Sequence, residues 1–206
     1  MKKIMTRLLS LVLLGAFIPS FVLAETWDLG KGDITVTATE TSQTVSQVNG
    51  ETKDDPDPVI TSSGKTENTV TINAETNATA NVTLENVNID TGTRGGAAIT
   101  TSGEGNVNIE LNGTNTVQSG NTHAGVEKNS TGTLTIKDEK NNKGSLTATG
   151  GNYGAGIGGG YEGSGSNIAI EGGKVKAIGG THGAGIGGGF GGSGSNIAIE
   201  GGKVEA

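Results

Sequence analysis

Short runs of alternating aliphatic and polar residues recur through the second half of the chain. Four of these runs carry their aliphatic residues at Val107/Ile109/Leu111, Leu134/Ile136, Ile168/Ile170 and Ile197/Ile199. A period of two places alternate side chains on the same face of an extended strand. The pattern therefore predicts β-strands with one aliphatic and one polar face, and no helix is expected after the first 24 residues.

Each alternating run belongs to a longer unit that repeats along the chain. A triplet of two small residues and one aliphatic residue precedes the run, and a third short strand follows it. The triplets are Ala97-Ala98-Ile99, Ala124-Gly125-Val126, Ala155-Gly156-Ile157 and Ala184-Gly185-Ile186, whose aliphatic members lie 27, 31 and 29 residues apart. Three short strands per unit predict an all-β fold, a parallel β-helix (solenoid) with an open C-terminal end.

The last two units are near copies of each other. Residues 150–177 and 179–206 are identical at 23 of 28 positions. The pairs that differ are Asn152/Thr181, Tyr153/His182, Tyr161/Phe190, Glu162/Gly191 and Lys176/Glu205. One coil has too few inward aliphatic residues to offset the entropy lost when its many glycines become ordered. Stability is therefore expected to come from the stacking of neighbouring coils.

The first 24 residues have the features of a secretory signal peptide. Lys2, Lys3 and Arg7 precede an apolar run over residues 8–18, and small side chains lead up to Ala24. A membrane-spanning helix needs about 20 apolar residues, so this run is too short for one. We expect cleavage after Ala24 and a secreted, extracellular protein that is free or associated with the cell surface.

The rest of the chain divides into two predicted parts. Residues 25–80 are expected to form N-terminal cap strands and a polar loop, and residues 81–206 the β-helix repeat domain. Trp27 and Leu29 are expected to help cap the first coil. The polar stretch over residues 40–69 is interpreted as a loop or a mobile arm.

The net charge and the cysteine content exclude several classes of partner and anchor. Loss of the three basic residues of the leader would leave eleven basic against twenty-one acidic residues, a net charge of −10. Such a surface repels phosphate backbones and anionic lipids, so neither nucleic acid nor membrane is expected as a partner after signal cleavage. The sequence contains no cysteine, which excludes disulfides and a lipoprotein anchor.

Four rings at equivalent positions of the last two units are candidate carbohydrate-binding residues. Tyr153 matches His182, and Tyr161 matches Phe190, all within glycine-rich segments. Exposed rings stack on the apolar faces of sugars. The alternative is that the rings fold over the glycines and shield the backbone from water.

Glu171 and Glu200 are the other two candidate carbohydrate-binding residues. Glu171 and Glu200 are equivalent, so stacked coils would bring them one strand spacing apart. Clustered carboxylates attract a cation such as Ca²⁺. Lys174 and Lys203 follow closely, so a solvated face of alternating charge is the competing interpretation. Asp54, Asp55 and Asp57 suggest a looser calcium site without complete ligand spacing, and no cofactor is assigned.

Catalysis finds little support in the sequence. Polysaccharide lyases of this fold need a basic residue beside an acidic calcium cluster, and Arg94 is the one arginine after the leader. His123 and His182 have no serine or cysteine nucleophile in a recognisable motif. The glycine-rich segments contain no phosphate-loop motif. We therefore expect a protein that is not an enzyme.

Several segments, taken together in order, resemble a known family. They are WDLGKG at 27–32, NVTLENVNID at 81–90, ELNGTNTV at 110–117, GSLTATGG at 144–151 and the two AGIGGG copies. The chain resembles the carbohydrate-binding-domain-containing β-helix proteins of Gram-positive bacterial surfaces over nearly all of its mature length. The resemblance implies a right-handed, pectate-lyase-like β-helix, an extracellular location, polysaccharide or cell-surface glycan as partner, and calcium in some relatives.

The sequence thus predicts a non-catalytic module that binds polysaccharide or acts as an adhesin, with several alternatives open. One is a purely structural repeat stalk, or a fragment of a larger surface protein. Relatives continue into further coils, whereas this sequence stops at Ala206, so end-to-end self-association is a further expectation. The hypothesis that the protein is a degraded lyase also remains open. Ice binding is weakened because threonines do not recur at each coil.

Overall fold

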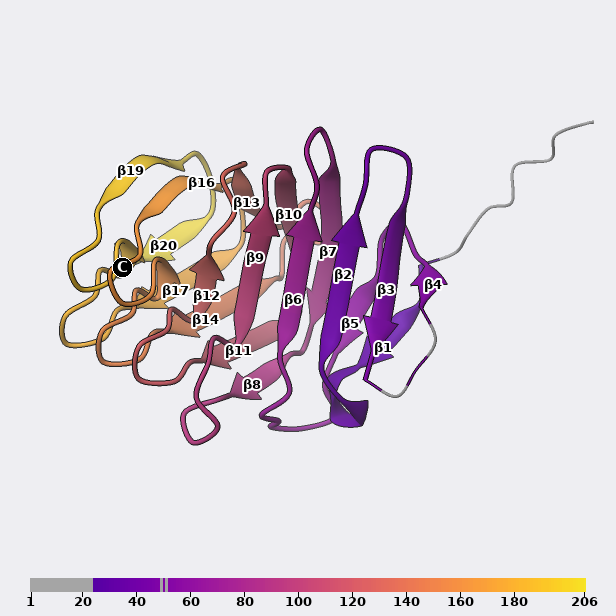
Figure 1. Ribbon diagram of the computed structural model, residues 1–206, viewed down its shortest axis with the longest axis horizontal. Coiled ribbons are helices and arrows are strands. Elements are labelled where there is room, and N and C mark those ends of the chain that lie inside the picture. Colours follow the sequence, from indigo (N-terminus) through magenta and orange to yellow (C-terminus); the bar gives the residue numbers. More distant parts are fainter. Residues whose placement is uncertain (1–23, 49, 51) are drawn as a thin grey trace, which may run out of the picture.

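Backbone pairing between successive coils builds the whole molecule. The computed structural model describes residues 24–48, 50 and 52–206, so the predicted signal peptide lies outside the described residues except for Ala24. Strands from successive coils pair in parallel and form three sheets, which together make a β-solenoid of about six turns (Figure 1). The predicted all-β architecture of stacked coils is confirmed.

The three sheets are named here by their strands in spatial order. Sheet A contains β1 (Thr26–Asp28), β5 (Val59–Thr61), β7 (Thr79–Glu85), β10 (Asn106–Asn112), β13 (Leu134–Lys137), β16 (Gly165–Ile170) and β19 (Gly194–Ile199). Sheet B contains β18 (Ile186–Gly187), β15 (Ile157–Gly158), β12 (Val126–Lys128), β9 (Ile99–Gly103), β6 (Val70–Ala74), β2 (Ile34–Ala38), β3 (Gln43–Gln47) and β4 (Lys53–Asp54). Sheet C contains β20 (Lys203–Glu205), β17 (Lys174–Ile178), β14 (Ser145–Thr149), β11 (Thr114–Gln118) and β8 (Asn88–Asp90).

The register of these sheets places like residues on like. Ile157 of β15 lies opposite Ile186 of β18, and β16 and β19 pair so that Ile170 meets Ile199. Columns of aliphatic side chains fill the interior, and Ile109, Ile136 and Ile170 are all fully buried. The interior columns predicted from the alternating runs are therefore confirmed.

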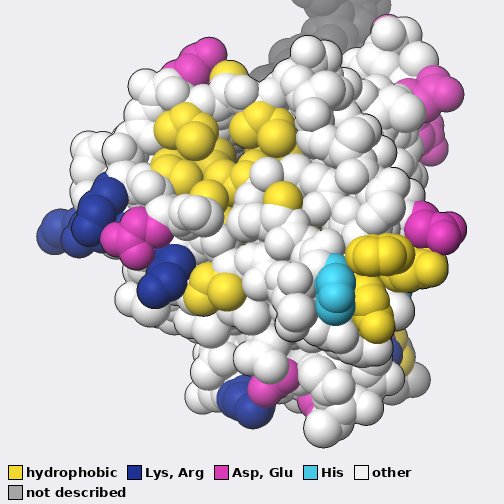
Figure 2. Space-filling view, turned by 90° about the vertical axis from the view of Figure 1, so that its left-hand side faces the viewer, with side chains coloured by type: hydrophobic (Ala, Val, Ile, Leu, Met, Phe, Trp, Pro, Cys, Tyr) yellow, Lys and Arg dark blue, Asp and Glu magenta, His cyan; other side chains and the backbone are white. Residues whose placement is uncertain are grey.

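The last coil forms an open end. Ile197 and Ile199 are 37% and 57% exposed because β19 is the final strand of its sheet. Figure 2 shows apolar side chains gathered on this end of the molecule.

The described residues of the stretch over 40–69 include three strands, β3, β4 and β5, so the prediction of a loop or a mobile arm was wrong. β3 pairs antiparallel with β2 and β4 pairs antiparallel with β3, so the hairpin extends sheet B at the N-terminal end. Val45 points into the core and is fully buried. The Gln43 amide donates to the carbonyl oxygens of Asp55 and Asn81, which explains why a polar sequence here forms an ordered strand.

Trp27 and Leu29 lie in the first coil, as expected, and both are buried. Trp27 Nε1 donates to Asp55 Oδ2 over 2.8 Å. Leu29 begins a 3-10 turn (η1, Leu29–Lys31), where the sequence predicted no helix. The Asp28 carboxylate accepts from the amide of Gly30 and caps this turn. In the described part of the chain, no helix is long and apolar enough to cross a membrane.

Glycine is required where the backbones of successive coils touch. A Cβ on Gly154 would lie 1.9 Å from the carbonyl oxygen of His123, and one on Gly183 would lie 2.0 Å from that of Gly154. These contacts involve backbone atoms that cannot move aside without breaking the pairing of coils. The repeated glycines at this corner therefore set the distance between coils.

Replacing Gly154 by alanine should destabilise the solenoid. The added methyl group would force two coils apart, so we expect a loss of about 2 kcal/mol or more in the free energy of unfolding. Urea unfolding followed by circular dichroism measures it. Gly64→Ala is the control, because a Cβ there meets nothing within 4 Å. Equal midpoints for the two variants would contradict the packing argument.

Replacing Asp55 by alanine should loosen the N-terminal cap. The carboxylate is fully buried and accepts from Trp27 Nε1, from the backbone nitrogen of Glu25 and, at 3.3 Å, from the amide of Asp57, so its loss removes the acceptor of all three donors. We expect a cost of about 2–4 kcal/mol in thermal or urea unfolding. Asp54→Ala, at the exposed neighbouring position, should change stability by less than about 0.5 kcal/mol. A comparable cost at both positions would argue against this role.

Candidate functional site

The four predicted rings come from two turns on either side of a very short strand. Tyr153 and His182 lie in the turns that lead from sheet C to sheet B, and Tyr161 and Phe190 in the turns that lead from sheet B to sheet A. The intervening strands β15 and β18 are only two residues long. The two turns of each coil are therefore close, and the Phe190 amide donates to the Tyr153 carbonyl oxygen over 2.8 Å.

The rings form one cluster instead of two separate columns. Tyr153 and His182 stack with their ring centres 5.1 Å apart, and Tyr161 and Phe190 stack at 5.8 Å. Edge-to-face contacts join the two stacks, with centre-to-centre distances of 5.8 Å for Tyr153–Tyr161 and 5.6 Å for His182–Phe190. The equivalence in the sequence predicted each stack, but not the contact between them. We call these four residues the ring cluster.

The ring cluster remains open to solvent. Tyr161 is 47% and Phe190 44% exposed, so a large part of each ring faces solvent instead of the glycine backbone. The carboxylate of Glu162 raises the pKa of the Tyr161 hydroxyl, mainly by repelling the phenolate charge and also through a hydrogen bond. Tyr161 is therefore a neutral hydrogen-bonding group at physiological pH, with an exposed ring.

A polar cavity of about 300 Å³ adjoins Tyr161. Its lining residues are Thr122, His123, Glu127, Asn129, Gly160, Tyr161 and Gly163. His123 Nδ1 and Glu127 Oε2 are 2.8 Å apart, and Asn129 Nδ2 donates to Glu127 Oε1 over 3.1 Å. The sequence did not single out this pair, because Gly158 occupies the place of Glu127 in the next coil and the repeat therefore gives no signal.

Glu171 and Glu200 do not belong to the ring cluster. They lie in the turns that lead from sheet A to sheet C, directly after the stacked residues Ile170 and Ile199. Both side chains are exposed. The prediction that they stack is consistent with this register, but the structure separates them from the rings along the coil, so they form no joint sugar site.

The structure does not assemble Asp54, Asp55 and Asp57 into a calcium site. Asp55 is committed to the amide of Glu25 and the indole of Trp27, and Asp57 pairs with Lys140. Asp54 lies exposed on β4. Within the described ranges, no group of three or more acidic, histidine or cysteine residues is placed to hold a metal ion.

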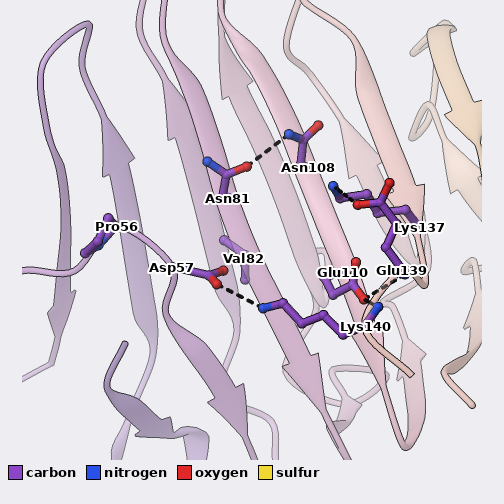
Figure 3. Close-up of a pocket in the computed structure, with 9 residues that line it drawn as sticks. All are labelled: Pro56, Asp57, Asn81, Val82, Asn108, Glu110, Lys137, Glu139 and Lys140. Carbon is purple, nitrogen blue, oxygen red and sulfur yellow. Dashed lines mark hydrogen bonds and ion pairs between the residues drawn. The ribbon is translucent and has the colours of Figure 1, made fainter. Parts of the chain in front are cut away.

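A second depression, which we call the polar groove, lies on the outer face of sheet A. It has a volume of about 300 Å³ and is lined by Pro56, Asp57, Asn81, Val82, Asn108, Glu110, Lys137, Glu139 and Lys140 (Figure 3). Asn108 donates to Asn81 over 3.0 Å across β7 and β10. Lys140 reaches across to Asp57, with Nζ and Oδ2 2.9 Å apart. Sequence reasoning missed this groove because its residues share no repeated motif.

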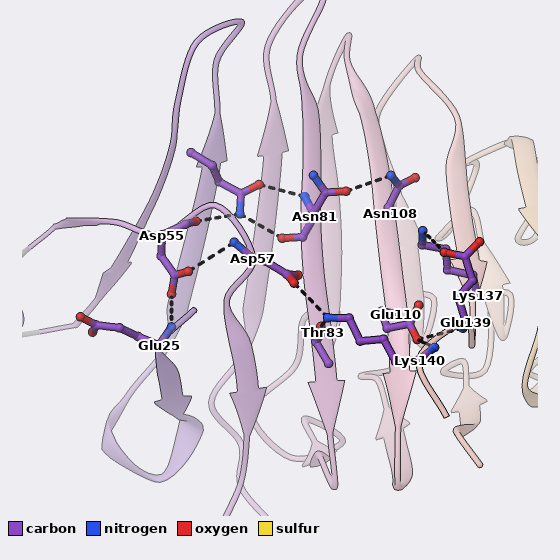
Figure 4. Close-up of polar contacts among 11 residues, drawn as sticks. Glu25, Asp55, Asp57, Asn81, Thr83, Asn108, Glu110, Lys137, Glu139 and Lys140 are labelled. Atoms are coloured by element: carbon purple, nitrogen blue, oxygen red, sulfur yellow. Dashed lines mark hydrogen bonds and ion pairs between the residues drawn. The ribbon is translucent and has the colours of Figure 1, made fainter. Parts of the chain in front are cut away.

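Glu110 organises the wall of the polar groove. Its side chain is buried and one carboxylate oxygen accepts from the amides of Glu139 and Lys140, at 2.9 and 2.8 Å (Figure 4). Lys137 pairs in turn with Glu139. The charged side chains of the groove are therefore paired with one another or with backbone groups.

Comparisons with known proteins give no relative for this chain: no family model, no curated protein and no solved structure matches it. The fold and the site define it as a β-solenoid that carries a ring cluster near its C-terminal end. The resemblance to carbohydrate-binding β-helix proteins remains a prediction.

Glu110→Ala should release the segment after β13. Loss of the acceptor frees the amides of Glu139 and Lys140, whose hydrogen exchange should become about 10-fold faster. Amide exchange measured by NMR tests this. Lys140→Met is the matched control, because it removes an exposed ion pair and leaves both amide bonds to Glu110 in place. Equal exchange in wild type and Glu110→Ala would contradict the assigned role.

Proposed function

We propose that the protein is a secreted, non-catalytic module that binds polysaccharide through the ring cluster. The observation that carries this proposal is the exposure of two stacked ring pairs at one corner of the solenoid. Pyranose rings have apolar faces that pack on aromatic side chains, with hydroxyl groups that need hydrogen-bonding partners. We also propose that the chain belongs to the carbohydrate-binding β-helix proteins that its sequence segments resemble.

The type of ring varies between the two copies while the register stays the same, which supports a role outside the core. The two copies are identical at 23 of 28 positions, yet both ring positions differ between them. The coil tolerates Tyr or His at one position and Tyr or Phe at the other without a change in register. In both copies these positions carry flat, partly apolar side chains, which is the property a sugar face requires.

The polar cavity beside Tyr161 complements the rings. The His123–Glu127 pair and Asn129 provide donors and acceptors within reach of a sugar that lies against Tyr161. The polar groove is a weaker candidate, since no aromatic residue lines it and its charges are already paired. We therefore assign the polymer to the ring cluster and its adjoining cavity.

Tyr161→Ala combined with Phe190→Ala should weaken polysaccharide binding by about 10-fold or more, because two stacking surfaces are lost. The fold should be unaffected, since both side chains lie outside the core. A glycan array first identifies a bound polymer, and retention on that insoluble polysaccharide then compares the two proteins. Circular dichroism confirms that the variant is folded.

Val48→Ala is the matched control, because Val48 is an exposed apolar residue that belongs to the N-terminal hairpin. Unchanged retention for this variant and loss for the ring variant supports the proposal. If the folded wild-type protein is retained on no polysaccharide, the proposal fails and a structural stalk becomes the better description. If the ring variant binds as well as wild type, the site lies elsewhere.

A further inference from the structure

A lysine lies in an interior column of the solenoid. Lys128 ends β12 and is 5% exposed. Its register partner is Thr101, which in turn pairs with Ile72, and both of these residues are fully buried. Lysine therefore occupies a place where earlier coils carry threonine and isoleucine.

The ammonium group of Lys128 has no carboxylate partner among the described residues. Its Nζ donates to the carbonyl oxygen of Ser130 over 2.6 Å and lies 3.2 Å from Ser130 Oγ. Within the part of the chain that the structure describes, no ion pair within 4.0 Å involves this group. Burial lowers the pKa of Lys128 below its ordinary value, and no charged neighbour offsets that effect. A buried charge without a counter-charge is unfavourable, so a bound anion at this position would stabilise the ammonium group.

Lys128 lines a cavity of about 410 Å³ that we call the lysine cavity. The other lining residues are Asn129, Ser130, Thr131, Gly163, Ser164, Ser166 and Asn167. These residues bring hydroxyl and amide donors, and none of them is acidic. Hydroxyl and amide donors around an ammonium group are a suitable set for an oxyanion.

A longer turn in the next coil forms one wall of this cavity. The chain takes eight steps from Val126 to Leu134, but eleven between their register partners Ile157 and Ile168. The three additional residues lengthen the turn that carries Tyr161. Asn129 and Gly163 line both the lysine cavity and the polar cavity beside Tyr161, so the two cavities are neighbours.

We propose that the lysine cavity binds an oxyanion group, a sulfate or a carboxylate, with Lys128 as its counter-charge. The group can be a free inorganic anion or a substituent of a larger ligand. The second case rests on the proposed function, because a sugar held against Tyr161 would carry its acidic substituent toward the neighbouring cavity. The net negative charge of the protein favours neutral or cationic polymers over acidic ones. The positive charge of Lys128 would reverse this preference locally and select sugar units that carry an acidic group.

NMR titration of the full chain with sodium sulfate, against sodium chloride at equal ionic strength, tests the site. We expect saturable shifts of the amides in residues 128–131 and 163–167. Lys128→Met should weaken the sulfate affinity by roughly 10-fold or more, because a charge-assisted contact is lost. Lys143→Met is the matched control, since it removes an exposed positive charge in the turn before β14.

Equal affinity in wild type and Lys128→Met, or shifts confined to other parts of the molecule, would overturn the proposal. If Lys128→Met does not fold, the wild-type titration decides: saturable shifts in both segments support the site, and their absence overturns it.

A second arm separates this inference from the proposed function. A sulfated or uronic acid oligosaccharide is compared with a neutral one of the same length, in wild type and in Tyr161→Ala. Loss of oligosaccharide binding in Tyr161→Ala with sulfate binding retained supports both proposals. Sulfate binding without any oligosaccharide binding supports the lysine cavity and contradicts the proposed function.

Discussion

Parallel backbone pairing between coils, in a fixed register, is the constraint on which the rest of the structure depends. It places residues about 29 positions apart in the sequence one strand spacing apart in space, about 4.8 Å. The aliphatic columns, the glycine corner and both ring stacks all follow from this repeat. The immediate neighbours of a side chain in one coil are therefore its equivalents in the coils on either side.

The turns between strands differ in length from coil to coil, whereas the register of the strands is fixed by their backbone pairing. The insertion after β15 leaves the register of β13 and β16 intact, yet it lengthens one turn by three residues. That turn carries Tyr161, which contacts Tyr153, and its Gly163 lines the cavities on both sides of Asn129. A rigid stack with variable turns is a general arrangement for placing binding groups, because the turns change without loss of core packing.

The two ends of the described solenoid differ in chemistry. At the N-terminal end, the antiparallel hairpin of β3 and β4 extends sheet B beyond β2, and the Trp27–Asp55 hydrogen bond connects β1 to the segment after this hairpin. At the other end, the edges of β18, β19 and β20 and the side chains of Ile197 and Ile199 are exposed.

The sequence by itself determined the coil, because period-two alternation and the near-identical copies specify which side chains face inward and which stack. It determined the pairs Tyr153/His182 and Tyr161/Phe190 for the same reason. Only the tertiary structure decided that these pairs touch, since the two-residue strand β15 brings two turns together. The tertiary structure also revealed the β3–β4 hairpin, the His123–Glu127 pair and the buried Lys128. The sequence did not predict them, because these residues do not recur in the next coil and so are not marked by the repeat.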